Sequence, residues 1–147
     1  MAGHEDPLVG FHFGVDIQGK VTGYFTECSG LGSEHEKIEH KVVTEKGQEM
    51  VLIIPGRLKW NDLVLKRGIT SSLDIWKWRK EVENGGVEGA RKDGSIVMFN
   101  WEGKEVARWS FKRAWPLKVS GPSVKSDGNE IAIEELTIVY EYFEREQ

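Results

Sequence analysis

The sequence predicts a mainly β domain, a β-barrel or sandwich of about eight or nine antiparallel strands with one packed α-helix. Short runs of alternating apolar and polar residues cover most of the chain, and pairs containing glycine separate them. Only residues 72–84 space their apolar side chains with the period of a helix. No linker or repeat divides the 147 residues, so residues 1–147 are expected to form a single domain.

The first pair of strands is expected in residues 10–28. Gln18-Gly19 is a suitable hairpin turn, and alternating apolar residues precede it. These apolar residues are Phe11, Phe13, Val15 and Ile17. A loop at residues 29–33 follows the pair.

A long hairpin is expected in residues 34–54. Its first strand is polar and β-branched as far as residue 45, and Lys46-Gly47-Gln48 turns the chain back. The returning run, residues 50–54, is apolar throughout and short enough to be a strand buried on both faces. Pro55-Gly56 then reads as a turn before a strand at residues 60–67.

One helix is expected over residues 72–84. Ser71 is a good N-cap, Asp74 follows in the capping-box position, and Gly85-Gly86 provide a C-terminal stop. The apolar face consists of Leu73, Ile75, Trp76, Trp78 and Val82.

The second half of the chain is expected to return to strands. The predicted strands are residues 95–101, 106–114, 117–120 and 131–143. Pro116 is expected to interrupt the pairing because proline lacks an N–H donor. A loop at residues 121–129 precedes the last strand.

Charge and composition weigh against several functions. A net charge of −4 and a pI near 5.6 are unlike those of a general nucleic-acid-binding protein. Cys28 is the only cysteine, so the chain can form neither an internal disulfide nor a multi-cysteine metal site. The N-terminus lacks the pattern of a signal peptide, and no apolar run reaches the ~18 residues of a membrane span. We expect a chain that is made in the cytoplasm without direct membrane insertion and stays there unless a particle or lysis releases it.

Two histidines are the only candidates for a metal site. His35 and His40 are five residues apart, whereas a zinc-binding helix needs four, and in a strand this spacing puts them on opposite faces. A solvated polar strand is the simpler interpretation. Cys28 is expected to be an inert buried thiol, and no catalytic set is present, so we expect no cofactor and no enzyme activity.

Short motifs run in a fixed order through nearly the whole chain. Asp6-Pro7-Leu8 comes first, and G-x-F-x-E-x-S-G-L begins at Gly23. Pro55-Gly56-Arg57 precedes the helix, and R-W-x-F-x-x-A-W-P begins at Arg108. In this order and spacing the motifs resemble the tail tube subunits of contractile phages and the inner tube proteins of contractile injection systems. The tube proteins of type VI secretion systems are a more distant resemblance. The hairpin segment 41–47 departs from the family pattern, which usually has a glutamate and a pair of glycines.

This resemblance implies a tail-tube-like fold and a structural function. Six-membered rings of the subunit would stack into a hollow tube, which a contracting sheath drives through a target envelope. The implied partners are further copies of the chain, the sheath protein, baseplate or spike and cap proteins, and a cargo effector or DNA in the lumen. The particle would be a phage tail or a tail-like injection system, which can also be released outside the cell.

The long hairpin supplies the candidate lumen residues. The odd positions from 35 to 41 of its first strand are polar and alternate in sign, whereas Ile38 and Val42 occupy the even face. The candidate lumen-facing residues are His35, Lys37, Glu39 and Lys41. The resemblance also implies that the hairpin tip and an N-terminal arm, residues 1–9, reach the adjacent ring. The candidate ring-stacking residues are Glu45, Lys46, Gly47, Gln48, Asp6 and Pro7.

A β-sandwich that binds a carbohydrate or a peptide is the alternative function. Tryptophan side chains are favoured as flat binding surfaces, and six are present. The candidates for stacking on a ligand are Trp60, Trp101 and Trp109.

Overall fold

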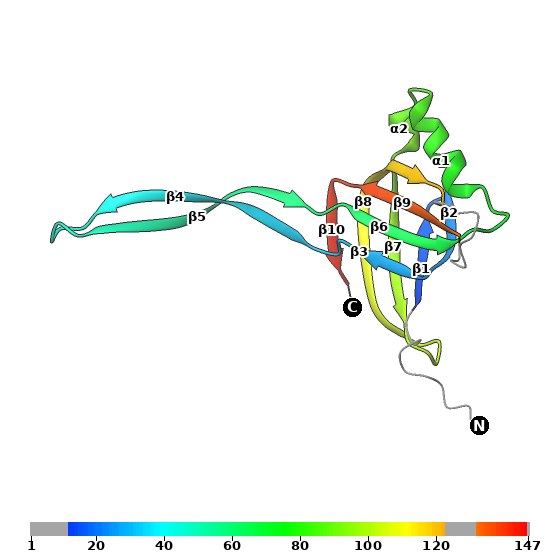
Figure 1. The fold of residues 1–147 in the computed structure, drawn as a ribbon, viewed down its shortest axis with the longest axis horizontal. Helices are drawn as coiled ribbons and strands as arrows, with labels where there is room; N and C mark the ends of the chain where they lie inside the picture. The colour runs from blue at the N-terminus through cyan, green and yellow to red at the C-terminus, as the bar shows by residue number, and fades with distance from the viewer. Residues whose placement is uncertain (1–11, 123–131, 147) are drawn as a thin grey trace, which may run out of the picture.

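The computed structural model describes residues 12–122 and 132–146, which contain ten β-strands and two α-helices. Eight strands form one antiparallel sheet, and the other two form a separate hairpin that projects from it (Figure 1). The prediction of a mainly β fold with antiparallel strands is confirmed. The N-terminal arm, with Asp6 and Pro7, lies outside the described residues.

The first strands agree with the alternation of the sequence. β1 (His12–Ile17) and β2 (Val21–Phe25) pair in antiparallel register around a tight turn, in which Gly19 has a φ of +68°. The predicted second strand ends early, because Thr26 separates β2 from β3 (Glu27–Ser29). The side chains of Val15, Ile17 and Phe25 are buried in the core.

The sheet curls around that core. Its strand order is β2-β1-β7-β8-β9-β6-β3, with β10 also paired to β8. The two end strands of this order, β2 and β3, are consecutive in the chain, and Thr26 between them donates its backbone N–H to the Lys66 carbonyl oxygen of β6 at 2.9 Å. The sheet therefore folds back toward its own edge around one core.

The strands after the helices are longer than predicted. β7 (Lys92–Phe99) pairs with β8 (Glu105–Ser120), a continuous strand that Pro116 does not end. Instead, the register against β9 shifts by one residue between Pro116 and Lys118. The predicted last strand is divided into β9 (Ile133–Val139) and β10 (Tyr142–Arg145).

A bulge in β8 explains this division. Lys112 and Arg113 are both exposed and together face Asp93 of β7, and Arg113 has a φ of +54°. The Arg113 N–H donates to the Asp93 carboxylate at 3.1 Å. Opposite the bulge, β9 ends at Val139 and β10 begins at Tyr142, and both pair with the same edge of β8.

The hairpin consists of β4 (Ser33–Val43) and β5 (Glu49–Trp60). The turn predicted at Pro55-Gly56 is wrong, because β5 continues through both residues, and the register only shifts opposite them, between His35 and Lys37. The strand predicted at residues 60–67 is also wrong at its start. β5 ends at Trp60, and β6 (Leu63–Gly68) begins after two residues and joins the main sheet.

The main helix α1 (Asp74–Glu83) is shorter than predicted, and the capping box is wrong. Leu73 is the N-cap, and the Asp74 carboxylate instead accepts hydrogen bonds from Arg67 and from the backbone of Ile75. Gly85-Gly86 end the helix as predicted, with a φ of +90° at Gly85. A second short helix, α2 (Val87–Ala90), was not predicted. In the described part of the chain, neither helix is long and apolar enough to cross a membrane.

A buried ionic network joins α1 to the sheet. Arg67 on β6 lies 2.6 Å from Asp74 and 3.9 Å from Glu134 on β9, and Glu134 is only 2% exposed. Trp76 of α1 donates its indole N–H to Glu134 at 2.9 Å. Burial acts to raise the pKa of Asp74, but the hydrogen bond and charge of Arg67 outweigh burial, and this pKa lies below its usual value. The network ties the start of α1 to β6 and β9.

Replacing Arg67 tests this network. We expect Arg67→Met to lower the free energy of unfolding by about 3 kcal/mol, because Glu134 would remain buried without its cation. The matched control is Lys66→Met, since Lys66 pairs with Glu27 on the exposed face at 3.7 Å; it should cost less than about 0.5 kcal/mol. Urea unfolding followed by tryptophan fluorescence measures both, and equal losses would contradict a special role for Arg67.

Candidate functional site: the projecting hairpin

The projecting hairpin is exposed on both faces within one subunit. Its apolar run, residues 50–54, was predicted to be buried on both faces, and this is wrong for the isolated chain. Leu52 is 42% exposed and Ile53 is 63% exposed. The reason is that β4 and β5 pair only with each other in the described part of the chain, so no second layer covers them.

The register separates the side chains of the hairpin into two different faces. Residues directly opposite each other in an antiparallel pair point to the same side. One side, here called the apolar face, carries aliphatic residues from both strands around His40. These residues are Ile38, Val42, Met50, Leu52 and Ile54.

The opposite side, here called the charged face, carries the candidate lumen residues of β4. The Lys37 ammonium lies 3.4 Å from the Glu39 carboxylate, as expected for neighbours on one face. The register adds two aliphatic residues from β5 that the sequence reasoning missed, because Val51 lies opposite Lys41 and Ile53 opposite Glu39. His35 lies beyond the register shift, opposite Leu58. The alternation of β4 alone could not reveal these partners, since they depend on the pairing.

A compact turn forms the tip of the hairpin. Thr44 and Gln48 close it, since the Thr44 N–H donates to the Gln48 carbonyl oxygen and the Gln48 N–H donates to the Thr44 hydroxyl. Gly47 has a φ of +77°, which a residue with a side chain rarely adopts. This turn lies at the far end of the β4–β5 hairpin, away from the main sheet (Figure 1).

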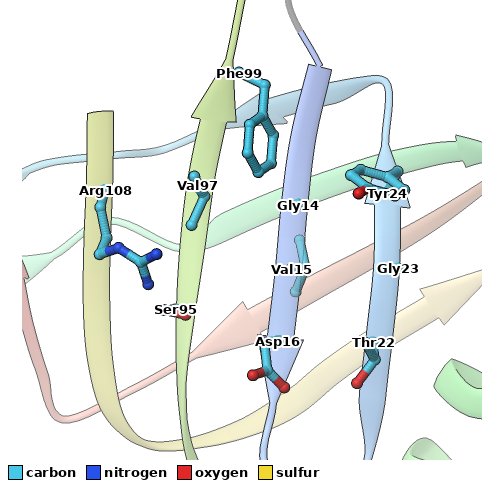
Figure 2. Close-up of a pocket in the computed structure, with 10 residues that line it drawn as sticks. All are labelled: Gly14, Val15, Asp16, Thr22, Gly23, Tyr24, Ser95, Val97, Phe99 and Arg108. Carbon is cyan, nitrogen blue, oxygen red and sulfur yellow. The ribbon is translucent and has the colours of Figure 1, made fainter. Parts of the chain in front are cut away.

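A shallow cavity of about 270 Å³ lies on the outer face of the main sheet. Gly14 has no side chain to fill it, and Phe99 lies over Gly14 beside Tyr24 (Figure 2). The His12 ring stacks on Phe99 at a centroid distance of 5.3 Å, so one end of the cavity is aromatic. The other end carries the polar side chains of Asp16, Thr22 and Ser95, with Arg108 at the side.

The three tryptophans proposed as stacking surfaces do not form one site. Trp60 and Trp109 are partly buried and pack against the core, whereas Trp101 lies exposed in the turn between β7 and β8. This arrangement weakens the carbohydrate-binding alternative, which requires several exposed rings on one surface. Among the described residues, no group of three or more histidine, cysteine, aspartate or glutamate side chains could hold a metal ion.

Cys28 on β3 points toward the core and packs against it. Burial raises the pKa of its thiol to about 12. Because the thiolate is the reactive form, this environment suppresses alkylation and oxidation. The thiol is therefore poorly suited to nucleophilic chemistry.

Comparison with known proteins gives a consistent picture. Residues 9–144 match the model of a family described as T4-like virus tail tube protein gp19. A chain of the PVC sheath–tube complex, an extracellular contractile injection system in its extended state, superposes with a TM-score of 0.73 at 23% identity, over 98% of this chain and 93% of that chain. A chain from the cap of the anti-feeding prophage gives a TM-score of 0.72 at 22% identity, over 99% and 93%. Hcp1 from Salmonella typhimurium gives 0.62 at 13% identity, over 92% and 85%. At these identities the likeness to solved structures concerns the fold. No curated protein sequence matches the chain.

The Cys28 environment predicts slow alkylation of the folded protein. At pH 8 we expect iodoacetamide to modify Cys28 at least about a thousandfold more slowly than an ordinary exposed cysteine, because so little thiolate is present. Unfolding in guanidinium should restore the ordinary rate. Mass spectrometry over time measures both rates, with Lys80→Cys as an exposed comparison in the same protein. Rapid labelling of native Cys28 would show that β3 opens readily.

Proposed function

The chain belongs to the T4-like virus tail tube protein gp19 family and is a tail tube protein of phage tails and contractile injection systems; from this premise we propose that its copies form six-membered rings that stack into a hollow tube. The function is structural. It lies in self-association and in the conduit that the rings enclose.

The uncovered apolar face of the hairpin carries this proposal. Five apolar side chains from two paired strands lie together on it, and on this face only His40 stands between Ile38 and Val42 and only Leu52 between Met50 and Ile54. A two-stranded hairpin is marginally stable alone in water, and a contiguous apolar surface is typical of a contact between proteins. A neighbouring copy of the chain is the partner that would cover this face in a ring.

The charged face would then line the lumen. Lys37, Glu39 and Lys41 alternate in sign, so the wall would not concentrate cargo of one charge. His35 would extend the polar wall toward the body of the subunit. Val51 and Ile53 make this wall less polar than the sequence of β4 alone implies. A protein effector or DNA is the cargo that such a conduit would carry.

The hairpin tip would contribute to stacking between rings. Gly47 and Gln48 form the turn, but none of Glu45, Lys46, Gly47 and Gln48 adds a side chain to the core. We assign the same role to Asp6 and Pro7 of the N-terminal arm, on the family resemblance alone.

The other expected partners are those of a contractile particle. The similar solved structures include a sheath–tube complex, a cap and a baseplate. By analogy, this tube would contact a sheath protein along its length and cap and baseplate or spike proteins at its ends. Assembly would occur in the cytoplasm, and the finished tail or tail-like particle could later leave the cell.

Substitutions on the two faces of the hairpin test the proposal. We expect Leu52→Glu to fold, because Leu52 is already 42% exposed in one subunit, but to require at least about a hundredfold more protein for ring formation, because assembly would bury the new charge. Glu39→Lys is the matched control on the charged face. It should leave assembly nearly intact, with a cost of no more than about 0.5 kcal/mol, while altering the loading or release of cargo.

Negative-stain electron microscopy and sedimentation of the purified variants measure these effects. Rings or tubes from the wild-type chain and from Glu39→Lys, but not from Leu52→Glu, support the assignment. A wild-type chain that stays monomeric to millimolar concentration would count heavily against ring formation. Equal assembly of both variants would show that the apolar face is not the contact.

Shortening the hairpin tip tests stacking separately. Replacing residues 45–47 with a two-residue Asn-Gly turn should spare folding and ring formation, because Thr44 stays opposite Gln48 and the strand register is kept, and Asn-Gly suits a tight hairpin. Tubes should become shorter or absent. Tube length in electron micrographs is the measurement, and full-length tubes from the shortened chain would show that the tip is not a stacking contact.

A further inference from the structure

The direction of the hairpin depends on a small set of contacts at its base. β4 and β5 form a sheet of their own, with no strand of the main sheet paired to either in the described part of the chain. Two short connections join this sheet to the body, residues 30–32 and 61–62. These connections, together with Trp60, are here called the hairpin root. Any angle between hairpin and body must be set there.

A hydrogen bond from the core reaches the hairpin root. The Tyr140 hydroxyl donates to the carbonyl oxygen of Asn61 at 2.5 Å. Asn61 in turn donates its backbone N–H to the Gly32 carbonyl oxygen at 3.2 Å, which ties the two connections together. Tyr140 thus holds both sides of the root through one main-chain residue.

Tyr140 is itself firmly placed. It is 8% exposed, and its ring lies 5.3 Å from Phe143 and 6.1 Å from Phe111, measured between centroids. Burial, with the nearby charge of Asp62, raises the pKa of its hydroxyl to about 12, so the hydroxyl remains a donor at any pH near neutrality. Trp60 packs against the same ring at a centroid distance of 6.1 Å.

The two connections also touch directly. Gly30 has a φ of +87°, and a side chain there would begin 1.9 Å from the carbonyl oxygen of Asp62. Only glycine permits so close an approach. The root is therefore held by backbone contact, by the Tyr140 hydrogen bond and by the packing of Trp60.

The length of the hairpin makes this angle important. β4 has 11 residues, and at about 3.3 Å per residue it extends about 36 Å from the root. A rotation of about 10° at the root would move the tip by about 6 Å, which exceeds the spacing of about 4.8 Å between paired strands. A loosely held hairpin would therefore meet a neighbouring subunit out of position.

We propose that Tyr140 is a positioning residue, which fixes the angle of the hairpin in the free subunit and so lowers the protein concentration needed for ring assembly. Its phenol ring belongs to the core, and its hydroxyl acts on the root. The part of this proposal that concerns assembly rests on the proposed tube function. The part that concerns the angle does not.

Pulsed electron spin resonance on the monomer measures the angle directly. Spin labels at Lys46→Cys on the tip and Lys80→Cys on α1, in a chain carrying Cys28→Ala, report the distribution of tip-to-body distances. The test variant is Tyr140→Phe, which removes one oxygen and keeps the ring. The matched control is Tyr142→Phe, because Tyr142 also packs against Trp60, at 5.9 Å, but its hydroxyl donates to the exposed side chain of Glu144.

We expect a narrow distribution of tip-to-body distances for the labelled chain with no substitution at the root and for Tyr142→Phe. For Tyr140→Phe the distribution should be at least about twice as wide. Loss of one such hydrogen bond should raise the concentration needed for assembly about fivefold. A second variant, Trp60→Leu, should widen the distribution as well. Thermal unfolding of each variant checks that the body is still folded. A residue that only stabilised the body would change the melting temperature without widening the distribution of distances.

An unchanged width in Tyr140→Phe would overturn the proposal, whatever Trp60→Leu shows. If Tyr140→Phe widens the distribution of distances but leaves the protein concentration needed for assembly unchanged, the proposed effect on ring formation is wrong. If the unmodified chain forms no rings at all, the proposed tube function fails, whereas the distance measurement still decides whether Tyr140 sets the angle.

Discussion

The bulge at Lys112 and Arg113 is the constraint on which the arrangement of this subunit depends. β8 pairs with β7 and β10 before the bulge and with β9 after it, so one strand serves both parts of a curled sheet. Arg113 adopts a positive φ, which is unfavourable for a residue with a side chain. Ion pairs from Arg113 to Glu88 and Glu141, and the hydrogen bond to Asp93, hold it there. The same bend interrupts β9 and β10 and directs Tyr140 into the core beneath the hairpin root.

The subunit combines a complete body with an incomplete hairpin. The body encloses its own core, and the deeply buried charges of its described residues, Arg67 and Glu134, belong to a network that also anchors α1. The hairpin encloses nothing and exposes aliphatic side chains on both faces. Hydrophobic stabilisation follows the apolar area removed from water, so covering the hairpin would add stabilisation that one subunit alone does not have. A tube subunit needs this division, because a stable body must present an edge that only other copies can complete.

Local patterns predicted some elements well and others poorly. The Gln18-Gly19 turn and the glycine stop after α1 were correct because φ preferences act over two or three residues. Pro55-Gly56 was misread as a turn, and Pro116 as a break, because edge positions and bulges let proline remain in a strand. Asp74 was assigned to a capping box, but the buried guanidinium of Arg67, seven residues away, competes more strongly for its carboxylate. The short helix α2 has four residues, too few for a periodic signal.

The sequence by itself determined the β class, the long hairpin with its alternating charges, and the resemblance to tail tube proteins. These properties follow from patterns of neighbouring residues and from the order of the motifs. Only the tertiary structure decided which residues share each face of the hairpin, because the partners of Glu39 and Lys41 come from β5 through the register. It also decided that the apolar run 50–54 is uncovered, and that Tyr140 reaches Asn61 across 79 positions of the chain. Burial and long-range pairing depend on which distant segments come into contact, and no local sequence pattern specifies those contacts.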